Sequence, residues 1–281
     1  MPLRTLLARF AIALVALAST ACERAVFAVA NRGVAPPEAT VAFAPDAGLA
    51  LDVYRPAMSG KAPVVVFFYG GAWERGERTQ YRFVGRRLAG EGVLAIVADY
   101  RTWPRAGFPA FVEDGARAVA WARRHAIEYG GDPQRIYVAG HSAGAQIAAL
   151  IGTDARYLAP HGLAPRDLAG VIGLAGPYEF SISGRLVPIF GPRTQWRAAQ
   201  AVHAVNGDEP PFLLVHGTDD RVVWAAGSER MAERLRAAGV RADLVLLPGA
   251  GHTAPLQGLY RPTRAPAVLP AIRAFVHPDP G

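Results

Sequence analysis

The chain has 281 residues, 51% hydrophobic and 19% charged, a composition that suits one large or two small globular domains and excludes a disordered chain. A single cysteine excludes both an intramolecular disulfide and a cysteine-based zinc site. The formal net charge of +7 comes from scattered arginines, since Lys61 is the only lysine, and no basic run is interleaved with aromatic residues, so we expect no nucleic-acid partner.

Residues 1–21 have the features of a cleaved export signal. Arg4 and Arg9 give a positively charged start, and the uncharged apolar run of residues 10–18 follows. That run is too short to cross a bilayer comfortably, which favours a cleaved signal over a permanent transmembrane helix. We therefore expect an exported protein.

Cys22 directly follows the small residues Ser19, Thr20 and Ala21. This arrangement resembles a bacterial lipoprotein signal, in which the cysteine becomes the lipidated first residue of the mature protein. Ser19 departs from that pattern, which favours leucine or another aliphatic residue there. The resemblance implies a membrane anchor at Cys22 and a cell-envelope location. The alternative is an ordinary secretory signal cut nearby, for instance after Ala28, which leaves the protein periplasmic or secreted.

From residue 40 onward, short apolar runs alternate with longer stretches of helical pattern. Residues 40–44 and 49–54 predict an antiparallel hairpin. Six later apolar runs suit strands that are buried on both faces of a mostly parallel sheet: residues 64–69, 93–98, 136–139, 171–174, 212–215 and 243–247. The expected helices are residues 81–89, 111–129, 143–151, 225–238 and 265–275. This order predicts one α/β domain over residues 40–281, with helices on both faces of the sheet and residues 22–39 as a tether or N-terminal segment.

About three dozen residues separate the predicted strands at 171–174 and 212–215, too many for a plain connection and too few for a domain. We therefore predict a small cap over a site. The candidates for the lining of a substrate pocket are four aromatic residues, Trp73, Tyr178, Phe180 and Trp196. The aromatic residues of the insertion, Phe190 among them, would equally suit its core.

The sequence Gly-His-Ser-Ala-Gly at residues 140–144 places Ser142 between a predicted strand and a predicted helix. Glycines two positions before and after a serine allow the close approach of strand and helix that a strained, exposed nucleophile requires. Such a turn projects the hydroxyl at the carboxyl edge of the sheet, where open α/β folds bind ligands. Ser142 is therefore the candidate nucleophile.

A serine nucleophile needs a histidine to accept its proton and a carboxylate to orient that histidine, in the chain order Ser, Asp, His for a turn of this kind. Asp219 and Asp220 follow the predicted strand at 212–215, and His252 lies in a glycine-rich loop after the next strand. We take Asp220 as the acid and His252 as the base, although the sequence alone leaves Asp219 open as the acid. His216, which ends a strand, is expected to be a packed, hydrogen-bonded residue.

Glycine-rich backbone also follows the predicted strand at 64–69. Glycines there allow the chain to turn and to point backbone N–H groups at a substrate oxygen. The helix that begins after Ser142 adds partial positive charge at the same place. We assign the oxyanion donors to the backbone N–H groups of Gly71, Ala72 and Ala143.

Four further stretches resemble those of a known family: residues 99–101 (Asp-Tyr-Arg), 108–109 (Phe-Pro), 113–114 (Glu-Asp) and 131–137, the last of which leads into the serine motif. With them, the chain resembles the α/β-hydrolases, close to the bacterial carboxylesterases and the prenylcysteine methylesterase-like proteins. The kynurenine formamidase-like hydrolases share much of this pattern. The resemblance covers residues 51–275, and Tyr69 stands where many relatives carry histidine.

Together these features predict a serine carboxylesterase that works through an acyl-enzyme, without a metal or an organic cofactor. Because the cap is small and the segment before Pro36 can fold over the opening, we expect short-chain or small aromatic esters as substrates. One alternative is an amide- or formamide-cleaving or peptidase-like hydrolase with the same three residues. A catalytically inactive envelope binding protein is the other. The oligomeric state is left open.

Overall fold

The computed structural model describes residues 25–57 and 60–278 of the chain. The predicted export signal at residues 1–21 and the predicted lipidation site at Cys22 lie outside these residues. Within the described part of the chain, no helix is both long and apolar enough to cross a membrane.

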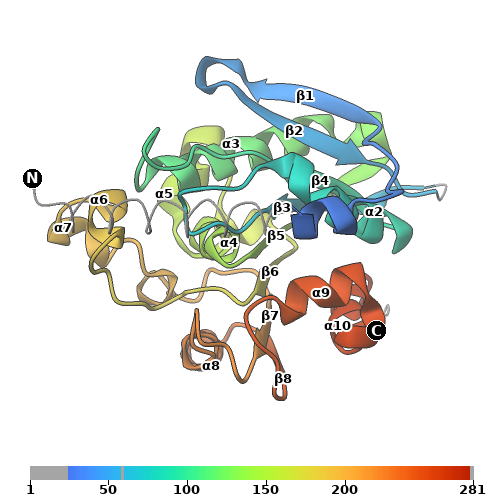
Figure 1. Cartoon of the computed structure of the whole chain (residues 1–281). Coiled ribbons are helices and arrows are strands. Elements are labelled where there is room, and N and C mark those ends of the chain that lie inside the picture. The colour runs from blue at the N-terminus through green and yellow to red at the C-terminus, as the bar shows by residue number, and fades with distance from the viewer. Residues whose placement is uncertain (1–24, 58–59, 279–281) are drawn as a thin grey trace, which may run out of the picture.

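Eight strands of the described chain form one sheet in the order β1-β2-β4-β3-β5-β6-β7-β8 (Figure 1). Their bounds are β1 (Ala39–Ala44), β2 (Leu49–Tyr54), β3 (Ala62–Phe68), β4 (Leu94–Ala98), β5 (Gly131–His141), β6 (Gly170–Leu174), β7 (Phe212–Gly217) and β8 (Ala242–Leu247). β1 and β2 pair as the predicted antiparallel hairpin, and β2 also runs antiparallel to β4. All other pairs are parallel. The predicted mostly parallel sheet is therefore confirmed, and the carboxyl ends of its parallel strands meet at one edge.

The prediction that the strands are buried on both faces is confirmed for the centre of the sheet and is wrong for its edge. β3, β4 and β6 are buried along their whole length. β8 is the last strand of the sheet and is only partly buried, with Leu246 36% exposed. An edge strand has a neighbour on one side only, which a run of apolar residues does not reveal.

Helices cover both faces of the sheet. The longer ones are α2 (Arg82–Gly90), α3 (Ala110–His125), α4 (Ala143–Thr153), α8 (Ala226–Ala237), α9 (Ala254–Tyr260) and α10 (Val268–Val276). α3 and α4 pack on each other and on β5, whereas α2 and α10 both contact α9 at the right of Figure 1. α9 is absent from the sequence prediction, because seven residues with a proline in the first turn show no clear helical period. α10 begins later than predicted, after a short turn of 3-10 helix, η7 (Pro262–Arg264).

The connection between β6 and β7 is a packed insertion. It contains two short helices, α6 (Leu186–Phe190) and α7 (Arg193–Trp196), at the left of Figure 1. Phe190 is fully buried, with its ring centroid 4.8 Å from that of Trp73 and 5.3 Å from that of Phe180. Tyr178 is also fully buried. Of the two roles that the sequence left open for these aromatic residues, the structure shows core packing.

Candidate active site

Ser142 occupies the tight turn between β5 and α4. Its φ of 53° lies in the left-handed region, which side chains rarely adopt. A Cβ at Gly140 would overlap the backbone of Gly144, and a Cβ at Gly144 would overlap the backbone of Phe68. Both glycines are therefore required for this close approach of strand and helix, and the strained turn exposes the Ser142 hydroxyl to a cavity.

His252 links Ser142 to Asp220. The Ser142 hydroxyl donates to His252 Nε2 at 2.9 Å, and His252 Nδ1 donates to Asp220 Oδ2 at 2.7 Å. Asp220 is buried, whereas Asp219 is exposed and lies next to Thr218. The structure thus brings together the three residues that the sequence singled out, with Asp220 and not Asp219 beside the histidine.

The carboxylate of Asp220 is held by further hydrogen bonds. Its Oδ1 accepts from the backbone N–H groups of Val222 and Val223, at 2.8 and 2.9 Å. Burial raises the pKa of Asp220, but the hydrogen bonds from Val223 and His252 outweigh burial, so the pKa lies below its ordinary value. Asp220 is therefore an anion that can stabilise a positively charged imidazole.

A second buried histidine contacts the same carboxylate. His216 Nε2 lies 3.0 Å from Asp220 Oδ2 and 2.9 Å from the carbonyl oxygen of Val223, and both of these atoms can only accept. Burial lowers the pKa of His216, so the ring is neutral with its proton on Nε2. Its Nδ1 then accepts from the Ser228 hydroxyl at 2.7 Å. The prediction that His216 is packed and hydrogen-bonded is confirmed; Ser228, which lies on α8, carries no signal in the sequence.

His141, which precedes the nucleophile, is a third buried histidine. Its Nε2 donates to the backbone carbonyl of His252 at 3.2 Å, and its Nδ1 has no hydrogen-bond partner among the described residues. Burial lowers the pKa of His141 to about 3, so the ring is neutral. His141 therefore ties the loop of His252 to the end of β5 without adding charge beside the base.

The loop after β3 adopts an unusual backbone. Gly71, Ala72 and Trp73 have φ values of 144°, 54° and 61°. A Cβ at Gly71 would overlap the carbonyl group of Arg75. Across the part of the chain that the structure describes, no acceptor pairs with the backbone N–H groups of Gly71, Ala72 or Ala143. Such unpaired donors beside the nucleophile are suited to bind a negatively charged oxygen.

A cavity of about 530 Å³ opens at Ser142 and is mostly apolar. One wall comes from the helical segment of residues 25–30, a second from Tyr81 and Phe83, and a third from α9. The lining residues include Val26, Phe27, Ala30, Gly71, Ala72, Tyr81, Phe83, Val222, His252, Leu256, Gln257 and Tyr260. The expectation that the segment before Pro36 folds over the opening is therefore confirmed. The short α9, which was not predicted from the sequence, supplies the third wall of the cavity.

The four predicted pocket residues do not line this cavity. Trp73 is buried behind the loop, where its Nε1 donates to Gln146 Oε1 at 3.1 Å and anchors the loop to α4. Phe180 stacks on Trp73, and Tyr178 is fully buried. Trp196 donates to the backbone carbonyl of Gly191 within the insertion. The prediction is wrong because the insertion packs on α3 and α4 and leaves the opening to the N-terminal segment.

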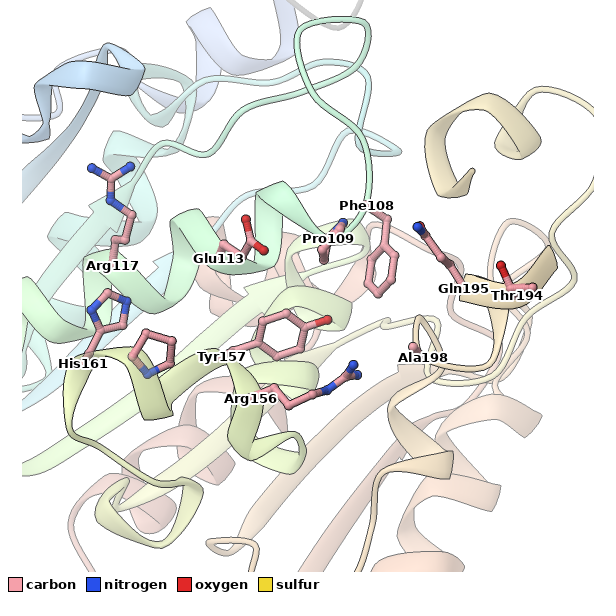
Figure 2. A pocket seen from close by; sticks show the side chains of 11 residues that line it. Phe108, Pro109, Glu113, Arg117, Arg156, Tyr157, His161, Thr194, Gln195 and Ala198 are labelled. Atoms are coloured by element: carbon pink, nitrogen blue, oxygen red, sulfur yellow. The ribbon is translucent and has the colours of Figure 1, made fainter. Parts of the chain in front are cut away.

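A second and larger cavity, of about 610 Å³, lies away from Ser142 between α3, α5 (Ala155–Leu158) and α7 (Figure 2). Figure 2 shows Glu113 and Arg117 projecting from α3, with Arg156 and Tyr157 on the opposite side. Arg117 is ion-paired with an aspartate outside the groove, and so is Arg156. We call this cavity the arginine groove. In the described ranges, no group of three or more His, Cys, Asp or Glu residues could hold a metal ion.

Several known proteins similar to this chain are esterases. A model of the BD-FAE family matches residues 51–183. Esterase LipC of Mycobacterium tuberculosis is 34% identical over 236 residues, which are 75% of this chain and 58% of LipC. The probable isoprenylcysteine alpha-carbonyl methylesterase ICMEL1 of Arabidopsis thaliana is 31% identical over 233 residues, 72% of this chain and 48% of that protein. The chain thus spans about half the length of the curated relatives that it matches.

Solved structures point the same way. The thermophilic esterase Est2 of Thermogutta terrifontis matches with a TM-score of 0.73 and 28% identity, over 86% of this chain and 94% of its own. The sheet order, the turn at Ser142 and these relatives agree with the resemblance seen in the sequence. The chain belongs to the α/β-hydrolase superfamily, and the relatives that it matches here are esterases.

Proposed function

We propose that this protein is a serine carboxylesterase in which Ser142, His252 and Asp220 form the catalytic triad. The observation that carries the proposal is the chain of two hydrogen bonds, 2.9 and 2.7 Å long, that joins these side chains at the mouth of an apolar cavity. A nucleophile, a base and an anion in this order are what acyl transfer requires.

The reaction begins when Ser142 Oγ attacks the carbonyl carbon of the ester while its proton passes to His252 Nε2. Asp220 stabilises the positively charged imidazole that results, and it stays ionised because its pKa is low. The carbonyl oxygen becomes an oxyanion and accepts from the backbone N–H groups of Gly71, Ala72 and Ala143. Each such donor lowers the barrier by on the order of 3 kcal/mol.

The tetrahedral intermediate then collapses. His252 returns its proton to the departing alkoxide, and the alcohol leaves an acyl group on Ser142 Oγ. A water molecule gives a proton to His252 and attacks the acyl carbon through the same oxyanion site. The carboxylic acid departs, and Ser142 regains its proton.

Short-chain or small aromatic esters are the proposed substrates. Phe27 and Tyr81 line the cavity, and its mostly apolar walls suit compact apolar groups. Two structures of Thermogutta terrifontis Est2 are described as bound to propionate and to butyrate, which are short carboxylic acids. This supports a similarly small acyl group here.

Hydrolysis of p-nitrophenyl esters from acetate to decanoate, with Ser142→Ala as the matched variant, tests this function. We expect activity on the short esters and a loss on the order of 10⁴-fold or more in the variant. A fluorophosphonate should label the wild-type protein and not Ser142→Ala. Activity on formamides or amides alone would replace the esterase by the related amide-cleaving hydrolase. A folded protein that neither hydrolyses nor labels would leave the binding-protein alternative.

We also propose that the protein is exported and is held at a membrane by a lipid on Cys22. Its support is the sequence pattern around Cys22. Four residues of chain span at most about 14 Å, so such an anchor would keep Val26, at the rim of the cavity, close to the lipid surface. Labelling of cells with an alkyne fatty acid should mark the wild-type protein in the membrane fraction. Cys22→Ser should lose the label and become soluble, and a wild-type protein without label would refute the anchor.

A further inference from the structure

The segment of residues 25–31, which we call the N-terminal clasp, lies between the predicted signal and the predicted domain. Residues 25–30 form a short helix with two different faces. Phe27 and Ala30 face inward and line the cavity at Ser142. On the outer face, Val29 is 59% exposed, and Val26, 66% exposed, lies at the rim of the cavity. A segment that the sequence predicts as a tether or N-terminal segment is thus folded against the candidate active site.

Asn31 fixes the clasp to the start of α2 and to the turn before it, about fifty positions further along the chain. Its Nδ2 donates to the backbone carbonyl of Gln80 at 2.8 Å, and its Oδ1 accepts from the backbone N–H of Phe83 at 3.0 Å. Tyr81, at the N-cap position of α2, makes no side-chain cap of its own. Asn31 therefore satisfies a donor at the start of α2 that would otherwise be unpaired, which holds the clasp in a defined place.

Phe27 also connects the clasp to the loop after β3, residues 70–73, which we call the oxyanion loop. Its ring centroid lies 4.9 Å from that of Tyr81, and the Tyr81 hydroxyl accepts from the backbone N–H of Gly70 at 3.3 Å. Tyr81 is buried and stacks on Tyr69, the residue before Gly70. Gly71, whose N–H is an assigned oxyanion donor, comes next in the chain. The contacts thus run from the wall of the cavity to the loop that binds the oxyanion.

We propose that the N-terminal clasp is a working part of the substrate site, in which Phe27 limits the length of one substituent of the ester and, through Tyr81, positions the oxyanion loop. This inference rests on the proposed esterase function. The proposed substrates are esters in which one of the two substituents, either the acyl or the alcohol group, is compact. Phe27 acts as a specificity and positioning residue, since the reacting atoms are held by other groups.

The first experiment compares Phe27→Ala and Phe27→Leu with Val29→Ala, a control on the exposed face of the same helix. Two ratios of kcat/KM are measured, p-nitrophenyl hexanoate to acetate and hexyl acetate to methyl acetate. We expect Phe27→Ala to raise one ratio by about tenfold, because removal of an apolar wall admits a longer chain. Phe27→Leu should raise it less, and Val29→Ala should leave both ratios at the wild-type value. A ratio cancels the concentration of folded enzyme, so partial unfolding cannot imitate this result.

The second experiment tests the connection to the oxyanion loop with Tyr81→Phe, which keeps the ring and removes the hydroxyl near Gly70. We expect kcat on the acetate ester to fall by about tenfold, less than the loss of an oxyanion donor itself, with both length ratios unchanged. A wild-type kcat in Tyr81→Phe would overturn the positioning role. Unchanged ratios in Phe27→Ala, or an equal shift in Val29→Ala, would overturn the specificity role. Each of these outcomes can be observed only if the wild-type enzyme is active. A wild-type protein that is inactive and is not labelled by the fluorophosphonate would instead refute the proposed esterase function.

Discussion

The cavity at Ser142 and the arginine groove are similar in volume, about 530 and 610 Å³, but they are built differently. The first is bordered by residues in the left-handed region of backbone space, Ser142 and Ala72 among them, and by a buried chain of hydrogen-bonded side chains. The second is bordered by arginines that are already ion-paired at the surface. Strain and a buried polar chain, rather than volume, distinguish a reactive site from a surface hollow. Each substitution below is expected to act at one cavity and not at the other.

The largest expected effect is that of Asp220→Asn. The change preserves shape but removes the anion that orients His252 and stabilises its charged form. We expect kcat on a short ester to fall by about 10⁴-fold. Steady-state kinetics of the purified variant will measure this, and circular dichroism will check that it is folded.

Two matched controls sharpen this prediction. Asp219→Asn changes the neighbouring, exposed aspartate, and Glu113→Gln removes a carboxylate from the arginine groove. Both should retain the wild-type kcat. An Asp219→Asn variant as inactive as Asp220→Asn would contradict the hydrogen bond that joins Asp220 to His252.

The sequence predicted most of the sheet and the three residues of the candidate triad. Parallel strands end at one edge, so side chains that follow β5, β7 and β8 must come close together once the strands are recognised. What the sequence could not show is the choice between Asp219 and Asp220. That choice depends on which carboxylate the loop after β7 turns inward, and the backbone N–H groups of Val222 and Val223 fix it.

The residues that form the walls of the cavity could not be predicted from the sequence, for a different reason. Aromatic residues suit a pocket and a core equally well, so the pattern could not show that Trp73 and Phe190 pack against each other. Phe27 lies in a stretch that could also have been part of a cleaved signal. The α9 residues Leu256 and Tyr260 lie in a helix too short to show periodicity. All of these depend on contacts between segments far apart in the chain.

Acid should destabilise the fold through its buried histidines. In the folded protein the pKa of His141 is lowered to about 3 and that of His216 is also lowered, in each case by burial. Such a group contributes stability above its ordinary pKa of about 6.5, and this contribution is lost as the pH falls toward the folded value. Between about pH 6.5 and 5, His141 should lower the free energy of unfolding by up to about 1.4 kcal/mol per pH unit, and His216 should steepen this slope in the same direction. Urea denaturation across this range measures the slope.

One histidine at each cavity tests where that slope comes from. His141→Asn removes the buried ring beside Ser142, and His161→Gln removes a half-buried ring in the arginine groove. We expect a clearly shallower slope in His141→Asn. The change in slope should be smaller in His161→Gln, because burial and the nearby Arg124 and Arg117 also lower the pKa of His161 but its ring is only partly buried. Equal slopes in all three proteins would show that the buried histidines do not couple protons to folding.

Ser228→Ala should have a smaller effect. The change leaves Nδ1 of His216 as a buried acceptor without its partner, which costs about 1–3 kcal/mol of stability. Because His216 also contacts Asp220, we expect kcat to fall by severalfold, far less than in Asp220→Asn. Ser228→Thr, which keeps the hydroxyl, should restore kcat if the hydrogen bond is responsible. A stable and fully active Ser228→Ala would exclude a role of this hydrogen bond in positioning Asp220.

The smallest expected effect is that of Arg156→Gln in the arginine groove. Arg156 is ion-paired with Asp154, but its side chain is 68% exposed, and such pairs contribute about 0.5 kcal/mol or less. The substitution leaves Asp154 its hydrogen bond from the backbone N–H of residue 156, which caps α5, so the helix should remain. We expect thermal unfolding and kcat close to those of the wild type. A change in kcat of more than about twofold would mean that the groove is coupled to Ser142, because the loss of a solvated ion pair is too weak to act over a distance by itself.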